Sequence, residues 1–98
     1  MTSKPISARH ARAIIEAAEL VKAPDWPDTR RWHVVSGGDV LVVIEPSYRG
    51  ASRSGRNGWT WWIASHARTH NRPEPTREKA AVAGLGAWQR SVTRKEQP

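Results

Sequence analysis

The chain has 98 residues, and its 16 Lys and Arg residues against 9 Asp and Glu residues give a formal net charge of +7. This length fits one small domain, and the lack of cysteine excludes disulfides, zinc–thiolate sites and a cysteine nucleophile. The longest apolar run, residues 40–44, is too short to cross a membrane, and residues 1–30 contain no secretory signal, so we expect a cytoplasmic protein.

The first predicted element is a helix over residues 7–22. The Ser7 hydroxyl can accept a hydrogen bond from a free amide of the first turn, and Pro24 ends the helix. A helical period places most of the apolar side chains on one side and leaves Ile15 outside: Ala13, Ile14, Ala17, Ala18, Leu20 and Val21. Residues 23–30 contain two prolines and are predicted to form an irregular connector.

Three strands and a second helix follow. The strands are predicted at residues 31–36, 39–45 and 59–65, with a tight turn at Gly37 and Gly38 between the first two. The helix is predicted at residues 77–92 with Thr76 as its N-cap. Its two internal glycines, Gly84 and Gly86, either allow a close approach to the sheet or make the helix locally weak. The fold class is therefore α+β, a three-stranded antiparallel sheet with an N-terminal and a C-terminal helix (α-β-β-β-α). We expect one domain over residues 6–93, with flexible tails at 1–5 and 94–98.

The positive charge is concentrated in the second half of the chain. Residues 1–46 contain six basic and six acidic residues, whereas residues 47–98 contain ten basic residues and three glutamates. The stretch 47–72 has no acid, and it contains two histidines, His66 and His70, and five arginines: Arg49, Arg53, Arg56, Arg68 and Arg72. Such a concentration of charge attracts a polyanion, although it can also serve only to keep a protein in solution.

Residues 47–58 are the strongest site candidate, because this glycine-containing loop is long for a hairpin and carries Arg49, Arg53 and Arg56. Arg68 and Arg72 alternate with the two histidines and could extend the same cationic stripe. Tyr48 or Trp62 could stack on a base. The competing interpretation is an ordinary solvated loop and connector.

The second sheet face is predicted to be apolar as well. Its expected members are Val35, Leu41, Val43 and Trp62. Three kinds of cover would suit it: a helix of the same chain, a second copy or protein partner, or unpaired bases stacked on Trp62.

Catalytic signals are weak. His33 or His66 could act as a general base in a nuclease, but the chain contains no paired-carboxylate, nucleophile-elbow or phosphate-loop motif. His66 and His70 lack enough neighbouring ligands for zinc. We therefore expect no enzyme, no metal and no cofactor.

The favoured hypothesis is a small basic accessory protein that binds DNA or RNA, contacts phosphates through its arginine-rich loop and has no membrane partner. The alternative is a protein-interaction module, a homodimer or a phage or bacterial modulator, that uses the apolar sheet face. A small ribonuclease is the third hypothesis.

Overall fold

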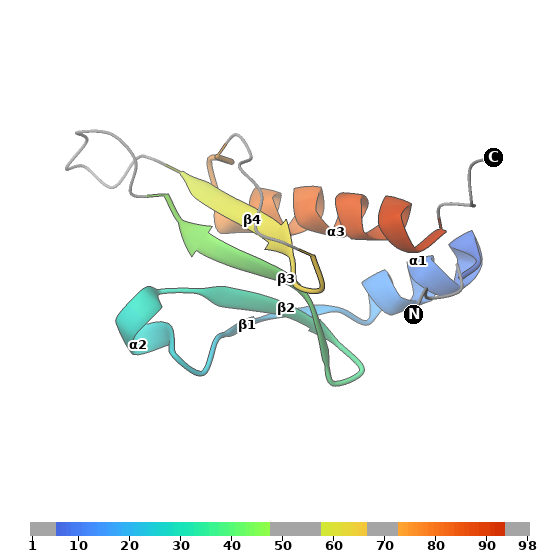
Figure 1. The fold of residues 1–98 in the computed structure, drawn as a ribbon, viewed down its shortest axis with the longest axis horizontal. Coiled ribbons are helices and arrows are strands. Elements are labelled where there is room, and N and C mark those ends of the chain that lie inside the picture. Colours follow the sequence, from blue (N-terminus) through green and yellow to red (C-terminus); the bar gives the residue numbers. More distant parts are fainter. Residues whose placement is uncertain (1–5, 48–57, 67–72, 94–98) are drawn as a thin grey trace.

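The computed structural model describes residues 6–47, 58–66 and 73–93 (Figure 1). Its elements are α1 (Ala8–Glu16), β1 (Glu19–Lys22), α2 (Trp26–Thr29), β2 (Trp32–Ser36), β3 (Asp39–Pro46), β4 (Trp59–Ile63) and α3 (Arg77–Thr93). The predicted α+β class, with an antiparallel sheet and a helix towards each end, is confirmed. The predicted tails and most of the predicted loop lie outside the described residues.

The sheet has four strands, so the prediction of three is wrong. All neighbouring strands are antiparallel, in the order β1-β2-β3-β4. The additional strand β1 comes from the end of the predicted first helix, which stops at Glu16. β1 pairs with β2 from Glu19 opposite Val35 to Lys22 opposite Trp32. This pairing supplies hydrogen-bond partners to backbone groups along one edge of β2, and a helix continued to residue 22 could not do so.

The early end of α1 also changes which side of the helix is buried. Ala11 is fully buried, and Ile14, Ile15 and Ala18 pack against the core, whereas Ala13 is exposed. Positions 11, 14, 15 and 18 form the ordinary helical spacing of one face. The predicted stripe was displaced because it included Leu20 and Val21, which belong to a strand with a different period.

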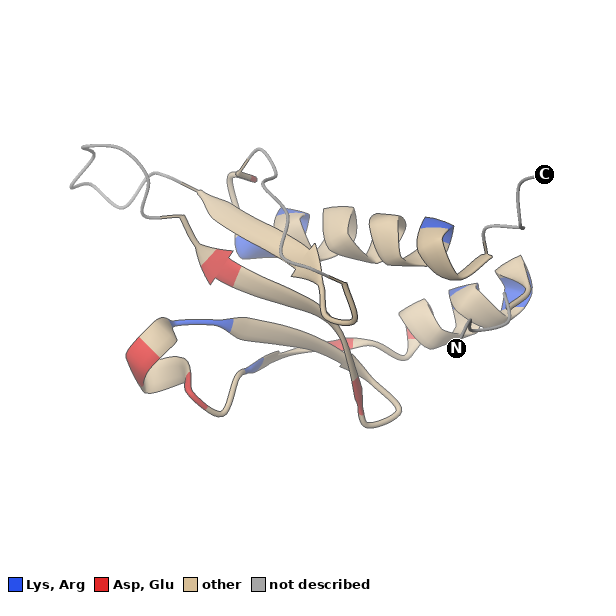
Figure 2. Ribbon diagram, viewed as in Figure 1, with Lys and Arg blue, Asp and Glu red and all other residues tan. Residues whose placement is uncertain are grey.

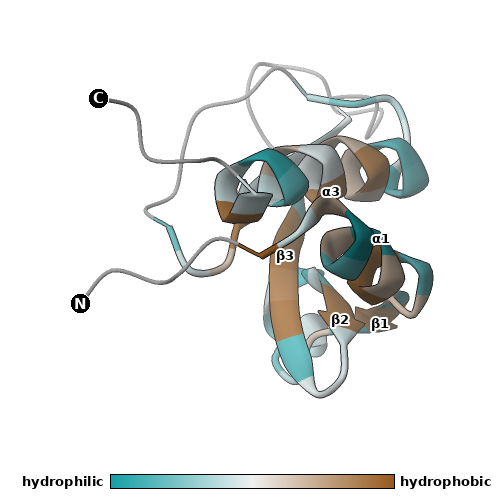
Figure 3. Cartoon of the chain, turned by 90° about the vertical axis from the view of Figure 1, so that its right-hand side faces the viewer, coloured by the Kyte–Doolittle hydropathy of each residue, from teal (hydrophilic) through white to brown (hydrophobic). Residues whose placement is uncertain are grey.

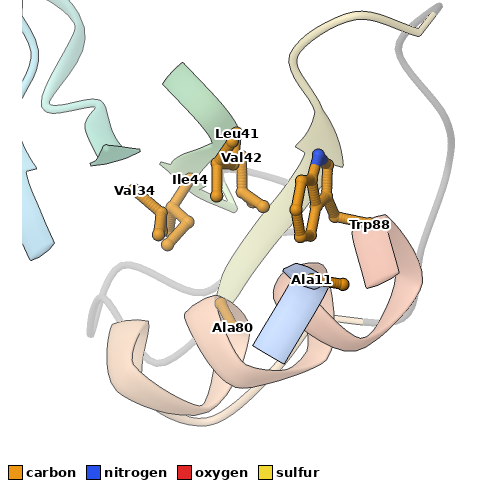
Figure 4. Close-up of a cluster of buried hydrophobic side chains, with 7 residues drawn as sticks. All are labelled: Ala11, Val34, Leu41, Val42, Ile44, Ala80 and Trp88. Atoms are coloured by element: carbon orange, nitrogen blue, oxygen red, sulfur yellow. The ribbon is translucent and has the colours of Figure 1, made fainter. Parts of the chain in front are cut away.

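The core lies between one sheet face and the two longer helices. Its buried members are Ala11, Val34, Leu41, Val42, Ile44, Ala80 and Trp88, which come from α1, β2, β3 and α3 (Figure 4). β3 is hydrophobic along most of its length (Figure 3), and it supplies Leu41, Val42 and Ile44 to this cluster. The helices α1 and α3 therefore both cover the sheet face that carries Val34, Val42 and Ile44.

A β-bulge moves Leu41 off the face on which it was predicted. Val34 lies opposite Val42, but Val35 lies opposite Val40, so Leu41 is an additional residue on β3. Only 7% of Leu41 is exposed, and it packs in the core with Val42. Simple alternation fails here because a bulge places two residues of one strand opposite a single residue of its neighbour.

Several local signals are confirmed. The Ser7 hydroxyl accepts a hydrogen bond from the His10 amide at 3.0 Å, and the Thr76 hydroxyl accepts one from the Lys79 amide at 3.0 Å. Gly37 and Gly38 have φ angles of 59° and 86°, as a two-residue hairpin turn requires. These features depend on neighbours in sequence, so they can be recognised without the tertiary structure.

Gly84 is the point at which α3 approaches the sheet most tightly. A Cβ atom at this position would lie 2.5 Å from one methyl carbon of Val42 and 3.1 Å from the other. At Gly86, two residues further on, the nearest atom would be the end of the Arg90 side chain at 3.5 Å. The expected close approach is therefore made by Gly84.

The two glycines form a matched pair for mutagenesis. Gly84→Ala should lower the free energy of unfolding by about 1 kcal/mol, since overpacking costs about 1–3 kcal/mol and exceeds the gain in helix propensity. Gly86→Ala should raise the free energy of unfolding by up to about 1 kcal/mol, because only the propensity gain applies. Urea unfolding measures both effects, and an equal rise in both variants would contradict the close packing at Val42.

Leu41 and Val43 test the bulge in the same way. Leu41→Ala should lower the free energy of unfolding by about 2–4 kcal/mol, because it empties a buried site. Val43→Ala, on the other face of β3, should lower it by about 1 kcal/mol or less, because Val43 is only half-buried. Thermal or urea unfolding distinguishes the two. Similar losses in both variants would place Leu41 outside the core.

Candidate nucleic-acid interface

The predicted contact residues fall mostly on two segments outside the described residues. Tyr48, Arg49, Arg53 and Arg56 belong to residues 48–57, and Arg68 and Arg72 belong to residues 67–72. Trp62 lies in β4 and is half-buried. Of the predicted site, the structure therefore describes the residues that flank the two segments and the sheet face on which Trp62 lies.

The described part of the molecule is electrically neutral. It contains eight Lys or Arg residues and eight Asp or Glu residues, so their formal charges cancel. Basic and acidic positions are interspersed over its helices and strands (Figure 2). The other eight Lys or Arg residues and one glutamate lie in residues 1–5, 48–57, 67–72 and 94–98, and they account for the whole net charge of +7.

The residues that flank segment 48–57 lie beside the residues that follow segment 67–72. The Ser47 amide donates a hydrogen bond to the Gly58 carbonyl at 2.9 Å, which closes the base of segment 48–57. Trp59 and Glu74 exchange two backbone hydrogen bonds of 2.8 Å, which bring the chain after segment 67–72 to the same place. Ser47 and Gly58, which flank segment 48–57, therefore lie with Glu74 at the sheet end where β3 stops and β4 begins, whereas His66, which precedes segment 67–72, follows the opposite end of β4.

Gly58 is required for this arrangement. Its φ angle is 84°, and a Cβ atom would lie 2.6 Å from the Glu74 carbonyl oxygen and 3.0 Å from the Pro73 Cβ. Only glycine combines this backbone conformation with such a close neighbour. The sequence assigned Gly58 only to a long loop, and its contact with Pro73 and Glu74 joins residues too far apart along the chain to be foreseen.

A cluster of cations and indoles occupies the same end of the sheet. Trp26 and Trp32 meet edge to face, with ring centroids 6.4 Å apart. Lys22 Nζ lies 4.1 Å and the Arg30 guanidinium 4.2 Å from the centroid of the Trp26 ring, and the Arg77 guanidinium lies 4.0 Å from that of Trp32. Sequence reasoning missed this cluster, because its members come from β1, α2, β2 and α3.

Some of the cations at this end are paired with acids. Arg31 Nε donates to Glu45 at 2.9 Å and also lies 3.8 Å from Asp25, and Arg77 donates to Glu78 at 3.1 Å. The pKa of the Glu78 carboxyl is lowered, chiefly by a hydrogen bond from its own backbone amide and further by Arg77. Within residues 6–47, 58–66 and 73–93, Lys22 and Arg30 have no carboxylate within 4.0 Å, and both lie against the Trp26 ring.

The sheet face opposite the two longer helices carries three rows of side chains. The strand register defines the rows Val21–His33–Val43–Trp62, Arg31–Glu45–Thr60 and Glu19–Val35–Val40. We call this surface the open face. Val21 is 39% and Val40 is 38% exposed, and the other apolar members are half-buried. Val35, Val43 and Trp62 therefore lie together on this face as predicted, and Leu41 does not.

The histidines proposed for catalysis lie on different elements of the fold. His33 lies in the middle of the open face, and His66 follows β4, with its Nδ1 3.4 Å from the Ser65 hydroxyl. His70 lies outside the described residues. In the part of the chain that the structure describes, no three His, Cys, Asp or Glu side chains form a group that could hold a metal ion.

None of the described helices is long and apolar enough to cross a membrane. Comparison of the chain with protein-family models, with curated proteins and with solved structures gives no match.

Proposed function

We propose that the protein is a small, non-enzymatic, cytoplasmic accessory protein that binds nucleic acid mainly through phosphate contacts. The observation that carries this proposal is the concentration of positive charge in two segments that the sheet brings near each other. The described residues are formally neutral, segments 48–57 and 67–72 contribute five of the seven net positive charges, and Ser47 and Gly58 lie beside Glu74, which follows the second segment.

The chemistry of the two segments suits phosphate. Their charged residues are all arginines: Arg49, Arg53, Arg56, Arg68 and Arg72. Guanidinium groups bind phosphate oxygens in a bidentate way, and the stretch contains no carboxylate that would neutralise them locally. Contacts of this kind release counterions from the nucleic acid and give affinity with little sequence preference. Lys22 and Arg30, at the same end of the sheet, could add to this potential.

A second candidate function is self-association through the open face. It is favoured by the exposure of Val21 and Val40 beside Val35 and Val43, because monomers rarely leave a continuous apolar patch uncovered. A second copy of this chain is the occupant that this candidate requires.

Salt dependence tests the phosphate contacts. If four to five arginines each neutralise one phosphate, the logarithm of affinity should fall against the logarithm of salt with a slope of about −4 on duplex DNA and about −3 on single strands. Replacing Arg49, Arg53 and Arg56 by alanine should reduce the size of the slope by about two to three. Fluorescence anisotropy of a labelled oligonucleotide at several salt concentrations measures both slopes.

A second triple variant provides the matched control. Arg9, Arg12 and Arg90 are exposed on α1 and α3, and their replacement by alanine removes the same three charges from the folded body. This control should change the slope much less than the segment variant does. Equal effects of the two variants, or no binding at low salt, would contradict the proposal.

Light scattering tests the second candidate. Self-association predicts a dimer mass that returns to the monomer mass in Val43→Glu, because a buried unpaired carboxylate is costly at an interface. Arg9→Glu, which adds a carboxylate on exposed α1, should leave the mass unchanged. A monomer mass for the unmodified protein at all concentrations would eliminate self-association.

A further inference from the structure

We propose that the nucleic acid is single-stranded and that its unpaired bases stack on the open face, at Trp62 and His33. This inference rests on the proposed function and adds the class of substrate to it. It follows from the position of the open face relative to Ser47 and Gly58, the residues that flank segment 48–57.

Trp62 and His33 lie in one row of the open face. They belong to β4 and β2, and Val43 of β3 lies between them. Neighbouring strands are about 4.8 Å apart, so the two side chains are separated by about 10 Å across an apolar floor. Aromatic and histidine rings on such a surface can each stack on an unpaired base.

The neighbouring row lies between this floor and the residues that flank segment 48–57. Arg31, Glu45 and Thr60 form a row between Trp62 and the base of segment 48–57 at Ser47 and Gly58. Glu45 holds the Arg31 guanidinium at 2.9 Å, and the Arg31 guanidinium carbon lies 5.8 Å from the centroid of the Trp62 ring. A single-stranded nucleic acid whose phosphates bind the arginines of the segments would thus pass Arg31 before its bases reach Trp62.

A duplex does not suit this surface. Its bases are stacked inside the helix, so their faces are not available for stacking on Trp62 or His33 unless the duplex is distorted. The rings of Trp62 and His33 can therefore stack only on bases that are unpaired. Duplex DNA should bind through phosphates alone.

A second copy suits the surface less well than nucleic acid does. The open face includes Glu19, Arg31 and Glu45 as well as His33, whereas the core of a protein interface is depleted of charged residues. Two copies would also bring together two chains of net charge +7, which repel each other and attract a polyanion.

The test compares a fluorescein-labelled oligothymidylate with a labelled duplex of equal length, both at low salt and with the full chain. The unmodified protein should bind the single strand more tightly. Trp62→Leu should weaken single-strand binding roughly 5- to 150-fold, the effect of losing one stacked base, and leave duplex binding unchanged. Trp62→Phe, which keeps a ring, should retain most of the single-strand affinity.

Variants of His33 test base stacking independently if Trp62→Leu does not fold. His33→Ala should weaken single-strand binding selectively, and His33→Tyr should restore it, because tyrosine also offers a ring for stacking. Val40→Ala is the matched control, because it shortens an exposed side chain on the same face outside the stacking row. It should change neither affinity.

The outcomes separate the two proposals. Equal affinity for single strand and duplex, with no effect of either ring substitution, would overturn the stacking inference and leave salt-dependent phosphate binding in place. No binding of either oligonucleotide at low salt would overturn both. A change of oligomeric mass in Trp62→Leu without a change in single-strand affinity would make a second copy the occupant and overturn the inference.

Discussion

The close approach of Gly84 in α3 to Val42 in β3 is the contact on which the rest of the arrangement depends. Without a side chain at Gly84, the helix can lie directly on the central part of the sheet, and Ala80 and Trp88 then meet the buried side chains of β2 and β3. α1 packs against the same cluster through Ala11. Because both longer helices pack on this face of the sheet, neither helix covers the opposite face.

The neutrality of the folded body has a physical consequence for binding. Charges inside a compact domain repel one another when they are all of one sign, and this repulsion destabilises the compact state. Here the eight basic and eight acidic residues that the structure describes balance one another, and the basic excess lies elsewhere in the sequence. The proposed affinity for a polyanion therefore depends on residues other than those that form the described core.

Many local elements could be predicted from the sequence. The N-caps at Ser7 and Thr76, the Gly37-Gly38 turn and the helix beginning at Arg77 all depend on residues within a few positions of one another. The joint position of Val35, Val43 and Trp62 also followed from alternation along regular strands. In the candidate site, the sequence identified the arginine-rich stretch by its composition, because charge is a property of the residues themselves.

The sequence by itself determined the fold class, the caps and turns, and the concentration of arginine between residues 47 and 72. Only the tertiary structure decided that Glu19–Lys22 is a strand, that a bulge buries Leu41, that α1 and α3 pack on the same sheet face, and that Gly58 meets Pro73 and Glu74. Each of these depends on pairing or packing between residues distant along the chain. Such contacts override a local pattern: the apolar spacing predicted a helix through residues 19–22, but pairing with β2 makes them a strand.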